Sequence, residues 1–187
     1  MKTRMLLAAL FVALTTMGFD CINSPIVASV SLSPISGCWH VTAGSGQFND
    51  ETDSLVIRNF LNSTYKDKLT GLRISNIVIR ATPGYPNGNV TGDVSFGLDT
   101  LHANQPLLHF GGPYASFANG VSLLNPGTLI QYSPAGLQAL VGALNVSTPD
   151  SLPRTIVLKG VGSGPPVAEP SFDVCCEITF QADASVN

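Results

Sequence analysis

Apolar and polar residues alternate with a period of two along residues 90–98 and 172–180. This alternation turns one face of a strand to the core and the other to solvent, so it predicts two half-buried β-strands. Residues 155–161, rich in β-branched and aliphatic side chains, predict a third strand. We expect the side chains on the apolar parities to line one shared core: Val94, Phe96, Leu98, Ile156, Leu158, Val174, Ile178 and Phe180.

Residues 72–81 predict a fourth strand, whose apolar parity changes along its length. Ile74 and Ile77 lie on different parities, as one extra residue would cause, so a β-bulge is expected near Ser75 and Asn76. A strand buried on both faces is the alternative. Weaker strand signals lie at residues 26–32, 38–42, 54–60 and 106–110.

One helix, predicted over residues 133–145, interrupts this pattern. Ser133 can cap its amino end, and Pro134 follows where a missing backbone donor costs nothing. Its apolar stripe contains Leu137, Leu140, Val141 and Leu144. Short strands, Gly- and Pro-rich turns and a single short helix predict a mostly β fold, an antiparallel β-sandwich of about seven or eight strands.

The first residues have the layout of a secretory signal. Lys2 and Arg4 precede an uncharged apolar run at residues 5–14, which is shorter than the roughly 20 residues of a membrane-spanning helix. Cleavage after Gly18 fits the signal best, and cleavage after Ala28 is the second choice.

With residues 1–18 removed, residues 19–187 match one domain of ordinary size. Cys21 is also a candidate for lipidation, as the first residue of a mature bacterial lipoprotein. Phe19 and Asp20 stand where such a signal has small residues, so an ordinary mature cysteine is the alternative. In both cases we expect an exported protein of the periplasm, the outer membrane or the extracellular space.

The composition narrows the choice of partners. Charged residues make up 11% of the chain and its formal net charge is −3, so it has no basic surface for a nucleic acid backbone. Membrane contact is expected only through a lipid on Cys21. No cofactor is expected, because Gly160, Gly162 and Gly164 are followed by prolines and not by the helix of a phosphate-binding loop.

Four cysteines in an exported chain predict disulfides. A bond between the neighbours Cys175 and Cys176 would close a strained ring, so a long-range pair is expected. If Trp39 faces the core, Cys38 faces outward, as Cys175 does on its strand. The predicted disulfide is therefore Cys38–Cys175, and Cys176 is then a buried thiol or pairs with Cys21.

A metal site is the alternative use of the same cysteines. Cys38 and His40 form a C-x-H pattern that places two ligands on one strand face, near the Cys175–Cys176 pair. This set lacks the C-x-x-C spacing that is typical of structural zinc sites.

The sequence shows no catalytic constellation. His40, His102 and His109 stand apart from any serine or cysteine in a recognisable nucleophile context, and the glycines around Ser163 lack the G-x-S-x-G spacing. We therefore expect no enzymatic activity.

Two groups are candidates for ligand binding. Asp50, Glu51 and Asp53 offer carboxylates for a calcium ion in a surface loop, with a solvated turn as the alternative. Tyr85 and Tyr114 lie on Pro- and Gly-rich loops, where exposed rings can stack on sugars or anchor a partner. The alternative is that each tyrosine packs over its own turn.

The segments LRISNIVIRA, GNVTGDVSFGL, RTIVLKGVGSG and DVCCEITFQAD resemble those of immunoglobulin-like sandwich proteins of the bacterial envelope, uncharacterised lipoproteins among them. The resemblance extends over residues 54–183 and implies an envelope address without a chemistry. The expected function is a structural or interaction module whose partner is an envelope or extracellular protein or glycan. A ligand-binding domain, for carbohydrate, is the alternative, with Tyr85 and Tyr114 as its binding residues.

Overall fold

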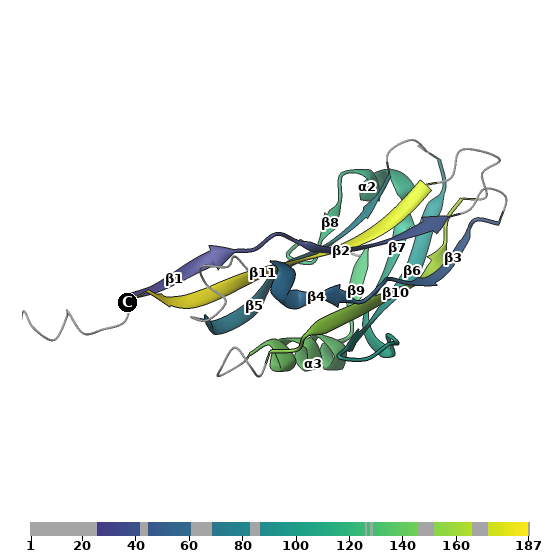
Figure 1. Cartoon of the computed structure of the whole chain (residues 1–187). Helices are drawn as coiled ribbons and strands as arrows, with labels where there is room; N and C mark the ends of the chain where they lie inside the picture. Colours follow the sequence, from purple (N-terminus) through teal and green to yellow (C-terminus); the bar gives the residue numbers. More distant parts are fainter. Residues whose placement is uncertain are drawn as a thin grey trace, which may run out of the picture.

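Two antiparallel sheets dominate the computed structural model, which describes residues 26–41, 45–60, 69–82, 87–125, 127, 129–145, 152–165 and 172–186 (Figure 1). The first sheet contains five strands, β1 (Ile26–Ser31), β2 (Ile35–Val41), β5 (Leu69–Ala81), β8 (Val121–Ser122) and β11 (Phe172–Val186). The second contains six strands, β3 (Gln47–Glu51), β4 (Leu55–Val56), β6 (Asn89–Leu98), β7 (Gln105–Pro113), β9 (Ile130–Tyr132) and β10 (Thr155–Ser163).

The strand order is that of a jelly roll. In the first sheet it runs β2-β11-β5-β8, with β1 beside the other half of β11, and in the second it runs β3-β10-β6-β7-β9. The order β2-β11-β5-β8 facing β3-β10-β6-β7 is that of two interlocked Greek keys, to which β1, β4 and β9 are added at the edges. The prediction of a mostly β antiparallel sandwich is confirmed. The predicted sandwich was immunoglobulin-like and had about seven or eight strands, whereas the described residues form eleven strands in the jelly-roll order.

β11 holds the first sheet together. One of its edges pairs with β1 and β2, and the other pairs with β5. The register between β5 and β11 shifts where Thr179 pairs with Asn76 and Phe180 pairs with Ile74, so Ser75 has no partner in the register. The predicted bulge near Ser75 is confirmed. Beyond it, β1 and the paired ends of β5 and β11 extend away from the second sheet (Figure 1).

The core lies between the sheets, and the predicted apolar parities are confirmed there. Leu98 is half-buried and packs against this core. The other seven predicted residues are at most 2% exposed: Val94, Phe96, Ile156, Leu158, Val174, Ile178 and Phe180.

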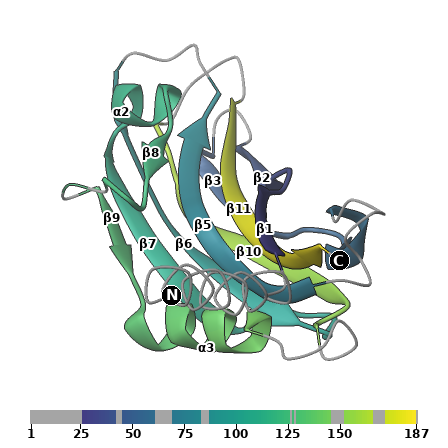
Figure 2. The same cartoon turned by 90° about the vertical axis from the view of Figure 1, so that its left-hand side faces the viewer.

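The predicted helix is α3 (Pro134–Leu144), which lies across one end of the sandwich (Figure 2). Ser133 caps it as expected, since its side chain accepts a hydrogen bond from Gly136 N at 3.2 Å. Leu140 and Leu144 are buried, whereas Val141 is 39% exposed and lies outside the buried stripe in which it was predicted.

Two short helical segments were not predicted. They are the 3-10 turn η1 (Ile57–Phe60), within a run expected to be a strand, and α2 (Tyr114–Ala118), near the end of the sandwich opposite α3. Within the described ranges, no helix is long and apolar enough to cross a membrane.

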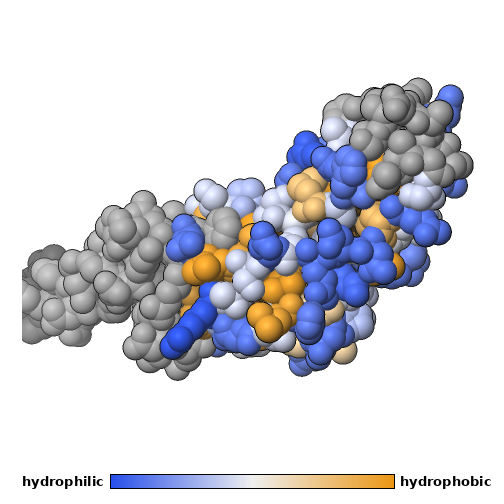
Figure 3. All heavy atoms as spheres, turned by 45° about the vertical axis from the view of Figure 1, so that its right-hand side comes forward, coloured by the Kyte–Doolittle hydropathy of each residue, from blue (hydrophilic) through white to orange (hydrophobic). Residues whose placement is uncertain are grey.

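The surface is mainly polar on the face drawn in Figure 3, where apolar residues reach the surface in a few groups between hydrophilic ones. The most exposed large apolar side chains are Leu101, 80% exposed, and Leu124, 77% exposed.

Candidate functional site

The predicted disulfide is present. Cys38 on β2 and Cys175 on β11 are register partners, their Cα atoms are 4.0 Å apart, and their sulfur atoms are bonded. Both side chains stand on the outward parity of strands that alternate buried and exposed positions. The bond therefore joins two adjacent strands whose cysteines are 137 residues apart in the sequence.

Cys176 points the other way and is a free, fully buried thiol. Burial raises the pKa of this thiol to about 12, so the reactive thiolate is scarce at neutral pH. The alternative of a metal site at the cysteines is not formed, because the sulfur atoms of Cys38 and Cys175 are bonded to each other and Cys176 faces the core. No group of three metal-binding side chains occurs among the described residues.

The predicted calcium loop is in part a strand, because Asp50 and Glu51 are the last residues of β3. Successive side chains of a strand point to opposite faces, so these two carboxylates do not converge on one ion. Asp50 Oδ1 instead accepts a hydrogen bond from Glu51 N at 2.8 Å, and Asp53 is an exposed residue of the following segment. The structure does not bring the three acids together as a calcium site.

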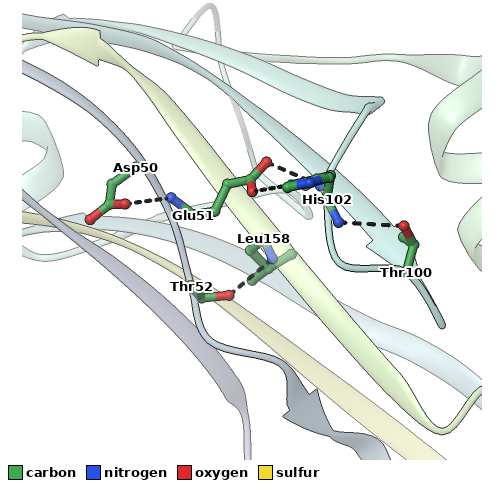
Figure 4. A network of polar contacts seen from close by, with 7 residues as sticks. Asp50, Glu51, Thr52, Thr100, His102 and Leu158 are labelled. Carbon is green, nitrogen blue, oxygen red and sulfur yellow. Dashed lines mark hydrogen bonds and ion pairs between the residues drawn. The ribbon is translucent and has the colours of Figure 1, made fainter.

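Glu51 is the centre of a polar network that connects β3 to the turn between β6 and β7 (Figure 4). Its Oε2 lies 3.1 Å from His102 Nδ1, and its Oε1 accepts a hydrogen bond from Ala103 N at 3.2 Å. The hydrogen bond from His102, supported by the one from Ala103, holds the pKa of the Glu51 carboxyl below its ordinary value of 4.5. The arrangement ties a turn to an edge strand.

Tyr114 is not a surface aromatic. It begins α2, is 1% exposed, and its ring meets the Phe172 ring edge to face at a centroid distance of 5.1 Å. Tyr114 is therefore buried and not exposed, but it packs against Phe172 of the distant strand β11, whereas the alternative expected it to pack over its own turn. Tyr85 and Cys21, the other candidates for ligand binding and lipidation, lie outside the described residues.

All three histidines have carboxylate partners, which no sequence pattern indicated. His40 Nδ1 lies 2.8 Å from Asp173 Oδ1, and His109 Nδ1 lies 2.9 Å from Asp93 Oδ1, both across adjacent strands. The third pair is that of His102 and Glu51. Two of the pairs depend on strand register, and the third depends on a turn that contacts a distant strand. These pairs could therefore be predicted only once the order and register of the strands were known.

Two open grooves lie beside these networks. The first, of about 580 Å³, lies at one end of the second sheet between the turn at Asp99–Leu101 and the segment at Arg154. Asp99 adopts a positive φ of 51°, and its Oδ1 accepts hydrogen bonds from Arg154 N at 2.8 Å and Thr155 N at 3.0 Å. This carboxylate therefore fixes the wall of the groove, in which Leu101 is exposed.

The second groove, of about 470 Å³, crosses β6, β7 and β9 on the second sheet. It contains the pair of Asp93 and His109, and Gln131 and Tyr132 also line it. Neither groove was predicted from the sequence, because their residues come from segments that are separate in the chain.

Comparison with known proteins finds only weak structural similarity. No protein-family model and no curated protein matches the chain. Among solved structures, the chain is similar to that of Desmodium yellow mottle tymovirus, with 15% identity, a TM-score of 0.38, and 88% of this chain and 85% of the other covered. The structure of turnip yellow mosaic virus at 100 K is 15% identical with a TM-score of 0.40, and the match covers 88% of this chain and 96% of the other.

The decameric BFDV capsid protein gives 9% identity and a TM-score of 0.41, with 86% of this chain and 100% of the other covered. With identities and TM-scores this low, these similarities carry no argument about what the chain does. The resemblance to bacterial envelope proteins stays a prediction.

Proposed function

We propose that this chain is an exported structural or interaction module of the cell envelope or extracellular space, without catalytic activity. The disulfide between Cys38 and Cys175 is the observation that carries the proposal, because such bonds persist in oxidising compartments and are rare in the cytosol. The apolar run at residues 5–14 supports the same address.

The histidine pairs support a structural role. Each of the three histidines is engaged by a carboxylate at the surface, and each pair connects neighbouring strands or a turn and a strand.

Export is tested by expressing the full chain in a bacterial host and fractionating the cells. We expect a shortened protein outside the cytoplasm, with Cys38 and Cys175 resistant to alkylation until a reductant is added. Mass spectrometry of the product also identifies the cleavage site and any lipid on Cys21.

The matched control is Leu10→Arg, which interrupts the apolar run and should leave an unprocessed protein in the cytoplasm. A wild-type chain that stays full-length in the cytoplasm with both cysteines reduced contradicts the proposal.

A further inference from the structure

The groove across β6, β7 and β9 has a regular polar lining. Asp93 pairs with His109 in the register of β6 and β7, and His109 pairs with Gln131 in the register of β7 and β9. Register partners stand on the same face of a sheet, and adjacent strands are about 4.8 Å apart. Asp93, His109 and Gln131 therefore form a row about 10 Å long on the exposed face of the second sheet.

The row is accessible. The side chains of Asp93 and His109 are 69% and 49% exposed, and Gln131 is also exposed. His109 Nδ1 lies 2.9 Å from Asp93 Oδ1, and this contact orients the imidazole against the carboxylate. A carboxylate has about four lone-pair sites and an imidazole has a second ring nitrogen, so the contact leaves bonding capacity for a ligand.

The remaining lining determines which kind of ligand fits. Gln131 and Ser95 each carry a group that donates and accepts hydrogen bonds. Pro106 and Tyr132, which is 51% exposed, add apolar surface beside them. No lysine or arginine is among the residues that line this groove within the described chain, so it has no fixed cation to attract an anion.

We propose that this groove binds a neutral carbohydrate. A sugar presents hydroxyl groups that both donate and accept, which matches the row of Asp93, His109 and Gln131. It also presents apolar C–H faces, which can pack against Pro106 and the exposed part of Tyr132. An anionic ligand would meet Asp93 without a compensating cation.

This inference goes beyond the proposed module by giving it a ligand class. The sequence-based alternative placed carbohydrate binding at the loop residues Tyr85 and Tyr114, whereas this inference places it in the groove on the second sheet. Export and disulfide formation do not depend on the groove, so failure of sugar binding leaves the test of the proposed function intact.

The test uses the mature, disulfide-bonded protein and calorimetric titration with cellotetraose, maltotetraose, mannotetraose and chitotetraose. We expect saturable binding of at least one of them, with an affinity that does not change between low and high salt, because the ligand carries no charge. Asp93→Ala and Gln131→Ala should each lower that affinity, the first by about tenfold, as expected for loss of a hydrogen bond to a charged group.

The matched control is Asp173→Ala. It removes the carboxylate of the corresponding histidine pair, His40 and Asp173, on the other sheet, where the two atoms are 2.8 Å apart. Its affinity should stay within about twofold of wild type, a difference below about 0.5 kcal/mol. Thermal unfolding of each variant confirms that it is folded.

Three results would overturn the proposal. The first is the absence of binding to all four sugars at millimolar concentration, and the second is binding that Asp93→Ala and Gln131→Ala leave unchanged. The third is selective binding of another class in the same titration, such as sialyllactose, spermine or a polar tetrapeptide, in place of the neutral sugars.

Discussion

Glu51 shows how a residue that suggests a ligand site can have a role in the fold. Both of its carboxylate oxygens contact the turn between β6 and β7, through His102 and the backbone of Ala103. A run of three acids within four positions suggested an ion, but the strand directs neighbouring carboxylates to opposite faces. The strand conformation of the backbone sets the direction of each acidic side chain, and a cluster of acids in the sequence does not reveal that conformation.

The lowered pKa of Glu51 predicts a stability that depends on pH. The folded state holds the carboxyl below its ordinary value of 4.5, so the unfolded chain takes up the proton first as the pH falls. The contribution of Glu51 is therefore fully present above that value and is lost as the pH falls through the lowered pKa.

Urea unfolding at a series of pH values tests this prediction. Glu51→Gln should be less stable than wild type at neutral pH, and the difference should shrink below pH 4.5. A difference that is constant from neutral to acid pH would show that the charge of Glu51 has no role.

A substitution of Phe96 tests the register of the core strands. It is 2% exposed on β6, and Phe96→Ala should destabilise the fold by about 3 to 5 kcal/mol because it leaves a cavity. Leu124→Ala is the control, since its side chain is 77% exposed and the change should stay within about 0.5 kcal/mol. Equal urea midpoints for the two variants would mean that the register is different.

The strands that could be predicted are those whose alternation is long enough to define a parity. Residues 90–98 and 172–180 lie in β6 and β11, and even the bulge at Ser75 followed from a change of parity. β8 and β9 were missed because two or three residues show no period. β3 was missed because its sequence, QFNDE, is mostly polar.

The candidate site was less predictable than the strands. The groove depends on pairing across β6, β7 and β9, and contacts such as that of Asp93 with His109 appear only when the register is known. The disulfide was predictable because a bond between the neighbours Cys175 and Cys176 is strained and strand parity placed Cys38 and Cys175 outward.

Two glycines of α3 give opposite predictions for the same substitution. Alanine is the better helix former by about 1 kcal/mol, so Gly142→Ala should stabilise the protein by up to that amount, as nothing lies within 4 Å of its added Cβ. At Gly136 the same Cβ would lie 1.7 Å from Pro106 O, so the helix must move away from β7.

We expect Gly136→Ala to destabilise the protein by about 1 to 3 kcal/mol, against the helix propensity. Thermal unfolding of both variants measures the contrast. If both variants are stabilised, α3 does not pack against the start of β7 as described.

β11 is the strand on which the first sheet depends. It pairs with β1, β2 and β5, and the disulfide fixes its contact with β2. The bond closes a loop of 137 residues, so it limits the unfolded chain over most of the described fold.

Removing the bond should therefore lower stability. On the chain-entropy model, replacing Cys38 and Cys175 by serine costs about 4 to 5 kcal/mol, measured by urea unfolding without reductant. Dithiothreitol should lower the stability of the wild type and leave that of the double variant unchanged. If the oxidised wild type and the double variant unfold at the same urea concentration, the bond does not limit the unfolded chain.

The position of β11 also governs the order in which the protein can be made. β1 and β2 emerge more than a hundred residues before the strand that pairs with them, so during synthesis the edges that later pair with β11 have no partner. Contacts this distant in sequence make folding slow and leave the incomplete chain prone to aggregation. The first sheet therefore forms only after β11 has been synthesised, and until then the edges of β1 and β2 are open to pairing with other chains.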